Sequence, residues 1–223
     1  MPRDRRPRRV LVVAGGETAP VHGLGAVLPP CDIVVAADSG VHNAQALGLV
    51  IDVIVGDFDS ASVAAVAAAV VAGATLERFP TAKDKTDLEL ALDHARGVGG
   101  GDGTELVVVA SVAGRLDHAL ANLLVLASPS YEHCRIDAYI DRWLITVLRD
   151  ETRAIVVRAG ATVTLLVVDD RAARVTTRGL LYPLDDELVY RSSTRGVSNV
   201  AVGEEIEVRV DGGVLFVLRE WAD

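Results

Sequence analysis

Two short acidic stretches are the parts of the sequence best suited to chemistry. Asp57 and Asp59 follow an apolar run, residues 53–55, which predicts a strand that ends at Gly56. Side chains two residues apart on extended backbone point the same way, so both carboxylates should lie on one side of the strand end. Each raises the proton affinity of the other unless a cation sits between them. Magnesium prefers oxygen ligands and often combines carboxylates with substrate phosphates, so we expect a magnesium–phosphate site.

A second acidic stretch, Lys83-Asp84-Lys85-Thr86-Asp87, repeats this chemistry further along the chain. Thr86 followed three residues later by Glu89 is a capping box, which predicts that a helix begins at Thr86. Asp87 then falls in the first helical turn, where the helix dipole stabilises a carboxylate. This placement is compatible with a purely structural role for Asp87 as well as with a role in a site.

The pair Asp57 and Asp59 also has a structural alternative, in which one carboxylate caps a helix beginning near Ser62 and the other is solvated. The wider pattern favours function, because polar clusters follow several predicted strands, and ligands bind at the carboxyl ends of parallel strands. The clusters are Asp38, the pair Asp57 and Asp59, residues 83–87 beyond Pro80, and Arg115 with Asp117 at a helix start. Their expected convergence on one cleft is the main argument for catalysis from the residues.

The elements that must position these clusters alternate between strands and helices. Short runs of Val, Ala and Leu predict buried strands, and apolar residues at helical spacing predict helices. The predicted strands are residues 10–14, 33–37, 53–55, 75–79, 106–110 and 135–140; the predicted helices are residues 41–47, 62–71, one from Thr86 with Leu88, Ala91, Leu92 and Ala95 on its buried face, and one with an apolar stripe from Leu116 to Ala127. The alternation predicts an α/β fold, a Rossmann-like three-layer α/β/α domain with a mainly parallel sheet.

From about Leu144 the pattern changes to short β-branched segments between turn residues. The predicted strands are residues 154–157, 162–168, 174–177, 205–210 and 214–218, with a long candidate functional loop over residues 179–199. No long helix interrupts them, which indicates a smaller C-terminal all-β domain, sandwich-like or a partial barrel. We therefore expect a disordered basic tail over residues 1–9, an α/β catalytic domain over 10–145 and a β-sandwich domain over 146–223.

Bulk composition narrows the class of protein. The 223 residues carry a formal net charge of −9, and a nucleic-acid-binding face would need clustered Lys and Arg, so no nucleic acid partner is expected. No apolar run reaches the length of a membrane span, so no membrane partner is expected either. The Arg-rich start lacks the apolar region of a secretory signal. Cys31 and Cys134 make no disulfide framework, and a cytoplasmic location is the expectation.

With these residues in view, the chain resembles the thiamine pyrophosphokinase (thiamine diphosphokinase) family. The family pattern runs A-D-G-G, G-D-x-D-S, K-D-x-T-D-x-x-x-A-L, G-G-R-x-D-H-x-L-A-N, G-L-x-Y-P-L and G-x-S-N. The corresponding stretches here keep that order over roughly residues 36 to 200, and they are residues 37–40, 56–60, 83–92, 113–122, 179–184 and 196–199. Ser39 and Ala113 depart from the pattern, each where the family usually has glycine.

The resemblance implies a two-domain homodimer that transfers the pyrophosphoryl group of ATP to the thiamine hydroxyl and releases AMP. ATP and Mg²⁺ would bind the α/β domain, and thiamine would bind near a subunit interface that includes the β domain. The implied residues are Asp57, Asp59 and Asp87 for the metal; Asp38, Lys83, Asp84, Thr86, Arg115 and Asp117 for ATP and its phosphates; and Ser198 and Asn199 for thiamine. Of these, Asp57, Asp59, Asp87 and Arg115 are expected to be catalytic. Phosphoryl transfer needs metal and cationic groups that neutralise charge, and this requirement agrees with the set.

Three alternatives stay open. A related pyrophosphokinase acting on another hydroxymethyl heterocycle, such as a pterin, would share the acidic motifs without needing Ser198 and Asn199. A catalytically inactive nucleotide- or thiamine-binding regulator would have less need for so many carboxylates. A nucleotide-sugar transferase also uses an Asp-x-Asp metal site, but it leaves residues 83–87 and the β domain unexplained. A P-loop kinase is disfavoured, since no G-x-x-x-x-G-K-[S/T] occurs.

Overall fold

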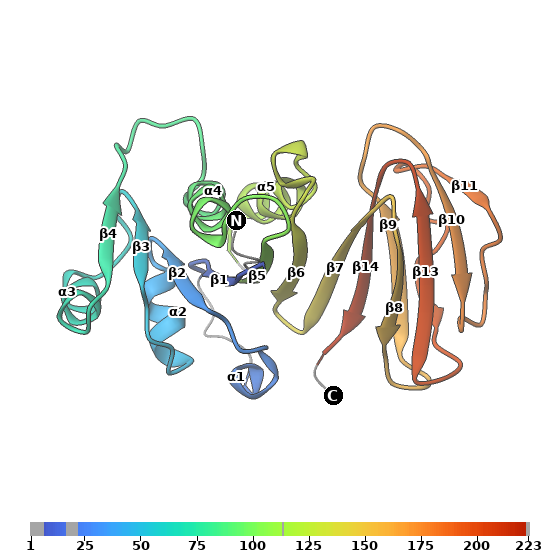
Figure 1. The fold of residues 1–223 in the computed structure, drawn as a ribbon, viewed down its shortest axis with the longest axis horizontal. Coiled ribbons are helices and arrows are strands. Elements are labelled where there is room, and N and C mark those ends of the chain that lie inside the picture. The colour runs from blue at the N-terminus through green and yellow to red at the C-terminus, as the bar shows by residue number, and fades with distance from the viewer. Residues whose placement is uncertain (1–6, 17–21, 113, 222–223) are drawn as a thin grey trace, which may run out of the picture. The chain divides into compact units, whose positions relative to one another are not determined.

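The computed structural model describes residues 7–16, 22–112 and 114–221 (Figure 1). The chain divides into two compact units, residues 1–125 with 133–141 and residues 126–132 with 142–223. Of the tail predicted over residues 1–9, residues 1–6 lie outside the described part, and Arg9 already begins the first strand. Within the described residues, no helix is long and apolar enough to cross a membrane.

The first unit is built on parallel strands in the order β6-β5-β1-β2-β3-β4. Apolar β-branched runs form the central strands, which are buried on both faces. The strands are β1 (Arg9–Val13), β2 (Ile33–Ala37), β3 (Val53–Gly56), β4 (Thr75–Arg78), β5 (Glu105–Ala110) and β6 (Arg135–Ile140). All six strand regions predicted for this part of the chain are therefore confirmed to within a residue or so at each end. Because the strands are parallel, the loops after them share one edge of the sheet.

Helices lie on both sides of this sheet in Figure 1, with α4 and α5 on one side and α1, α2 and α3 on the other. They are α1 (Leu24–Val27), α2 (Gly40–Ala46), α3 (Val63–Val71), α4 (Asp87–Gly99) and α5 (Leu116–Val125). The Ser62 hydroxyl accepts from Ala65 N–H at the start of α3, and the Thr86 hydroxyl accepts from Glu89 N–H at the start of α4. The predicted helix start at Thr86 is thus confirmed. A short 3₁₀ helix, η1 (Pro129–Tyr131), belongs to the second unit.

The apolar stripe that predicts α5 points outward instead of into the core. Leu116, Leu120 and Leu124 are 70%, 52% and 58% exposed, and Ala119 is the buried residue of this helix. By contrast, the predicted buried face of α4 is confirmed, since Leu88, Ala91, Leu92 and Ala95 are all buried. The apolar periodicity of the sequence therefore predicted the positions of both helices, but it predicted the buried face correctly only for α4.

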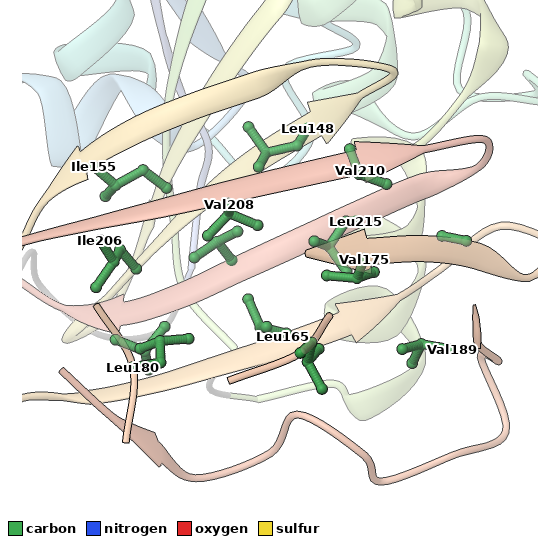
Figure 2. Close-up of a cluster of buried hydrophobic side chains, with 14 of the residues drawn as sticks. Leu148, Ile155, Leu165, Val175, Leu180, Val189, Ile206, Val208, Val210 and Leu215 are labelled. Carbon is green, nitrogen blue, oxygen red and sulfur yellow. The ribbon is translucent and has the colours of Figure 1, made fainter. Parts of the chain in front are cut away.

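The second unit consists of two antiparallel sheets, β12-β9-β14-β7 and β11-β10-β13-β8. Its strands are β7 (Trp143–Arg149), β8 (Thr152–Val156), β9 (Thr162–Val167), β10 (Ala173–Arg178), β11 (Glu187–Val189), β12 (Asn199–Val200), β13 (Glu205–Asp211) and β14 (Val214–Glu220). Alternate side chains of β13 are buried, as expected of a strand with one face on a core. Figure 2 shows the resulting core, to which both sheets contribute, for example Leu165 from one and Val208 from the other. Strands β7, β11 and β12 were not predicted from the sequence.

Candidate active site

Asp38, Asp57 and Asp59 come together at the carboxyl ends of β2 and β3. Asp38 follows β2 directly, and its N–H donates to Val55 O of β3 at 2.8 Å. Because β2 and β3 are adjacent and parallel, the residues after them lie at the same edge of the sheet. Each aspartate contributes one carboxylate oxygen to a group whose atoms all lie within 4.8 Å of one another. The structure thus gathers three acidic side chains at one point.

The backbone around these aspartates adopts uncommon conformations. Asp38 and Phe58 have φ angles of +45° and +64°, in the left-handed region that residues other than glycine rarely adopt. Gly56 has φ of +151°, and a Cβ there would lie 3.0 Å from Asp38 Cβ and 3.1 Å from Asp87 Oδ1. Only glycine therefore fits at residue 56. Left-handed residues of this kind tend to cluster at functional sites, where the surrounding structure holds them in place.

Arg78 in β4 holds the turn that carries Asp57 and Asp59. Its guanidinium carbon lies 4.6 Å from the centre of the Phe58 ring, and its NH1 donates to Asp57 O at 3.1 Å. Both contacts restrain the main chain between the two aspartates. Arg78 was not predicted from the sequence, because its place beside the turn depends on the pairing of β3 with β4 rather than on a local motif.

Asp38 is a buried carboxylate in an electrostatically unfavourable position. It is 4% exposed, and its Oδ1 has no hydrogen-bond partner among the described residues. Burial raises the pKa of Asp38, and the nearby carboxylates of Asp87, Asp59 and Asp57 raise it further, while the Ser39 N–H opposes the change. A hard divalent cation would relieve this repulsion and would find the all-oxygen donors that it prefers. The residues present therefore fit Mg²⁺.

Lys83 lies between Asp57 and Asp87. Its Nζ is 3.0 Å from Asp57 Oδ2 and 2.8 Å from Asp87 Oδ1. The hydrogen bond from Lys83 is the main cause of a lowered pKa at Asp57. Burial lowers the pKa of Lys83, but the hydrogen bonds to Asp87 and Asp57 outweigh burial and leave the pKa raised. Lys83 therefore stays protonated and keeps Asp57 ionised.

The grouping of the acidic residues differs from the one expected for the metal. The expected ligands were Asp57, Asp59 and Asp87, whereas the close group consists of Asp38, Asp57 and Asp59. Asp87, in the first turn of α4, is joined to Asp57 through Lys83. We refer to Asp38, Asp57, Asp59 and Asp87 below as the acidic cluster.

A pocket of about 570 Å³ opens in the first unit, and two members of the acidic cluster, Asp38 and Asp87, line it. Four residues expected to bind ATP, phosphate or metal line it, namely Asp38, Thr86, Asp87 and Arg115. Asp84 is exposed on the loop before α4. The pocket therefore brings together residues that are far apart in the chain.

Several other residues that line the pocket were not predicted as site residues from the sequence. Gly15 and Gly16, which follow β1, line the pocket together with the hydroxyl residues Ser39 and Ser111. A Cβ at Gly15 would lie 2.0 Å from Ser39 Oγ, so a larger residue at this position would displace the Ser39 side chain. Glycine backbone and hydroxyl groups suit close contact with a phosphate-bearing ligand. The Gly15-Gly16 turn after a strand was the available signal.

His42 of α2 also lines the pocket and was missed. Its Nε2 accepts a hydrogen bond from Ser62 N–H at 3.2 Å. Ser62 is the residue that caps α3, shortly after the Asp57–Asp59 turn. His42 thus ties the end of that turn to α2. No local motif identifies it, since the contact depends on how α2 packs beside α3.

Arg115 and Asp117 form an exposed ion pair at the start of α5. Arg115 Nε lies 3.1 Å from Asp117 Oδ1, and the second contact joins Arg115 NH2 to Asp117 Oδ2 at 2.5 Å. The Arg115 hydrogen bond lowers the pKa of Asp117 to about 2. Asp117 therefore orients the guanidinium that lines the pocket. Ala113, one of the two departures from the family pattern, lies outside the described residues.

Ser198 and Asn199, the expected thiamine contacts, lie in the second unit and differ in environment. Asn199 is 3% exposed, accepts from Tyr182 N–H at 3.0 Å and donates to Tyr182 O at 2.7 Å. Its amide group is thus used to hold the loop that contains Tyr182. Ser198 is exposed, has φ of +57°, and donates its N–H to Thr164 Oγ1 at 3.0 Å.

Comparison with known proteins identifies the family. The sequence matches the catalytic domain of thiamin pyrophosphokinase over residues 24–138 and the vitamin B1 binding domain of thiamin pyrophosphokinase over residues 145–215. No curated protein matches the chain.

Solved structures show the same likeness. Thiamin pyrophosphokinase from Geobacillus thermodenitrificans is 28% identical, with a TM-score of 0.76, and the match covers 96% of this chain and 98% of that one. A thiamin pyrophosphokinase family protein from Enterococcus faecalis is 25% identical, with a TM-score of 0.79 and coverage of 96% and 100%. Thiamine pyrophosphokinase from Bacillus subtilis, 22% identical with a TM-score of 0.81 over 97% and 100% of the two chains, shares the fold. The chain belongs to the thiamin pyrophosphokinase family.

Proposed function

We propose that the protein catalyses the magnesium-dependent transfer of the pyrophosphoryl group of ATP to the hydroxyl of thiamine, giving thiamine diphosphate and AMP. Family membership supports thiamine diphosphokinase activity. One observation supports the ATP and metal chemistry above all others: carboxylate oxygens from the ends of two strands lie within 4.8 Å of one another. Charge gathered in this way beside a pocket is what a metal–triphosphate complex requires.

The chain's own residues would divide the work. Asp38, Asp57 and Asp59 would hold Mg²⁺, with Asp87 beside them. The bound cation would neutralise charge on the transferred oxygens. Lys83 and Arg115 would contact the phosphates, and Arg115 suits a forked contact.

The remaining ATP-site residues would act around this centre. Asp117 would keep Arg115 in the orientation for phosphate. Thr86 would bind a phosphate at the start of α4, where backbone N–H groups favour anions. Asp84 would lie at the outer rim of the loop before α4.

Thiamine would bind at the β domain through the loops that Asn199 organises. The buried amide of Asn199 holds Tyr182, and the Tyr182 side chain is 57% exposed. We therefore assign Asn199 the task of positioning this loop and Ser198 the direct contact with the substrate.

We further propose that the protein works as a cytoplasmic homodimer whose active site lies near the subunit interface. The exposed leucines of α5 support this, because three apolar side chains at helical spacing form a face that a second copy could cover. Light scattering after gel filtration should give a dimer mass, and Leu120→Glu should shift it toward the monomer. A monomeric wild-type protein would contradict the proposal.

The first unit, with helices on both sides of a parallel sheet, supports assignment to the Rossmann-like three-layer class. In that class, ligands bind at the carboxyl ends of the strands. The proposed ATP site agrees with that rule.

Product analysis tests the proposed reaction. The protein is incubated with ATP, Mg²⁺ and thiamine, and the products are separated by chromatography. AMP and thiamine diphosphate in equal amounts are expected. Formation of ADP would contradict pyrophosphoryl transfer, and turnover with a hydroxymethyl pterin but not with thiamine would identify the related pyrophosphokinase instead.

A further inference from the structure

Lys83 contacts carboxylate oxygens that a divalent cation would also seek. Its Nζ is 3.0 Å from Asp57 Oδ2 and 2.8 Å from Asp87 Oδ1. Only 13% of the Lys83 side chain and 7% of the Asp57 side chain are exposed. Water therefore screens this contact little, and the attraction between the charges is strong.

One lysine cannot balance the acidic cluster. Asp38, Asp57 and Asp59 lie together, and Asp87 shares Lys83 with Asp57. Four ionised carboxylates against one ammonium group would leave a net charge of about −3. The buried Asp38 Oδ1, which has no hydrogen-bond partner among the described residues, points to where more positive charge is needed.

We infer that Lys83 is the built-in counter-ion of the acidic cluster and that Mg²⁺ competes with it for the oxygens of Asp57. The inference rests on the proposed magnesium-dependent function. A cation held by Asp57 together with Asp38 and Asp59 would lie close to the ammonium group and repel it. Lys83 would then move away from Asp57 and become available to a phosphate. Cation binding and phosphate binding are thereby coupled through one side chain.

Lys85 provides a matched control from the same loop. It is also a paired lysine, with Nζ 3.3 Å from Glu89 Oε1 and 2.6 Å from Asp93 Oδ2. These partners lie outside the acidic cluster, and 42% of the Lys85 side chain is exposed. Lys85→Met therefore removes a lysine charge nearby without freeing the oxygens of Asp57 and Asp87.

Binding of Mn²⁺ as a probe for Mg²⁺, measured by electron paramagnetic resonance without nucleotide, tests the inference. Lys83→Met should bind Mn²⁺ about tenfold more tightly than the wild type, because a competing charge at close range is removed. Lys85→Met should stay within about twofold of the wild type. The melting temperature of Lys83→Met should be lowered without Mn²⁺ and largely restored by it, while its turnover falls because a phosphate contact is lost. Tighter metal binding with slower turnover is a combination that simple damage to the fold would not produce.

The outcomes separate this inference from the proposed function. If folded Lys83→Met binds Mn²⁺ no more tightly than the wild type, Lys83 is not a competitor, and the proposed function stands. Mn²⁺ binding to Lys83→Met only in the presence of ATP would also overturn the competition while leaving the reaction intact. No Mn²⁺ binding with or without ATP would remove the metal site itself. If the methionine variant does not fold, Lys83→Gln takes its place with the same expectations.

Discussion

The acidic cluster of the first unit and the apolar core of the second unit both contain buried side chains, yet these side chains affect stability in opposite ways. In the core, Leu165 and Val208 are 1% and 0% exposed and lie among other apolar side chains (Figure 2). In the cluster, Asp38 is 4% exposed but faces other carboxylates. Burying apolar surface stabilises the fold, whereas burying like charges costs free energy. The core therefore stabilises its unit, whereas the cluster lowers stability, as expected if it serves the proposed function.

The strongest test of this contrast is Asp59→Asn. The change removes one charge from the cluster and preserves the side-chain shape, so the fold should be kept. Turnover should fall by about two to three orders of magnitude, as when a group that stabilises charge in the transition state is removed. Steady-state kinetics, with circular dichroism as the check on folding, would measure it. Near-normal turnover would remove Asp59 from the metal shell.

In the apolar core, by contrast, Leu165→Ala should lower the free energy of unfolding and leave turnover unchanged. Truncation of a fully buried leucine costs about 2–5 kcal/mol of the free energy of unfolding. The matched control is Leu188→Ala in β11, where the leucine is 45% exposed and the expected loss is below about 0.5 kcal/mol. Urea denaturation measures both. Equal losses in the two variants would mean that the two-sheet core does not carry the stability of this unit.

Asp38→Asn should change stability and activity in opposite directions. The pKa of Asp38 is raised in the folded state, so the folded protein binds this proton more tightly than the unfolded chain. The resulting stabilisation is complete below the unfolded pKa, near 3.8, and is lost as the pH rises through the higher folded pKa. At pH 7 without divalent cation, Asp38→Asn should therefore raise the free energy of unfolding, while Mn²⁺ binding and turnover decrease. Loss of stability at pH 7 would contradict this account.

The smallest effect is expected for Asp117→Asn, which removes the negative charge from the exposed ion pair of Arg115 and Asp117. The pKa of Asp117 is lowered to about 2, so any stabilisation is present above pH 3.8 and is lost as the pH falls toward 2. Exposed ion pairs contribute little, and no measurable change in melting temperature is expected at pH 7. The KM for ATP should rise several-fold, because Arg115 loses the partner that orients it. An unchanged KM would separate Asp117 from the phosphate site.

Much of the fold was predictable because its signals are local. The Val- and Ala-rich runs before Asp38 and Asp57 identify strands, and Thr86 with Glu89 identifies the start of α4. By contrast, β11 and β12 are too short to carry a periodic pattern, and their pairing depends on partners distant in the chain.

The sequence predicted which residues belong to the candidate site better than it predicted how their side chains are arranged. The positions of Asp38 and Asp57 after neighbouring strands indicated that they would meet. That Asp38 joins Asp57 and Asp59, while Asp87 is held by Lys83, depends on side-chain directions that spacing does not reveal. Arg78 escaped notice for a similar reason, since its contact with the turn exists only once β3 and β4 pair.

The most direct test of the central claim is a crystal structure with Mn²⁺ and an ATP analogue that carries a methylene bridge between the α- and β-phosphates. Anomalous scattering would locate the metal without ambiguity. We expect a Mn²⁺ peak bound by carboxylate oxygens of Asp38, Asp57 and Asp59, with the analogue's phosphates in the adjoining pocket. A Mn²⁺ ion held by the phosphates alone, away from these aspartates, would contradict this claim.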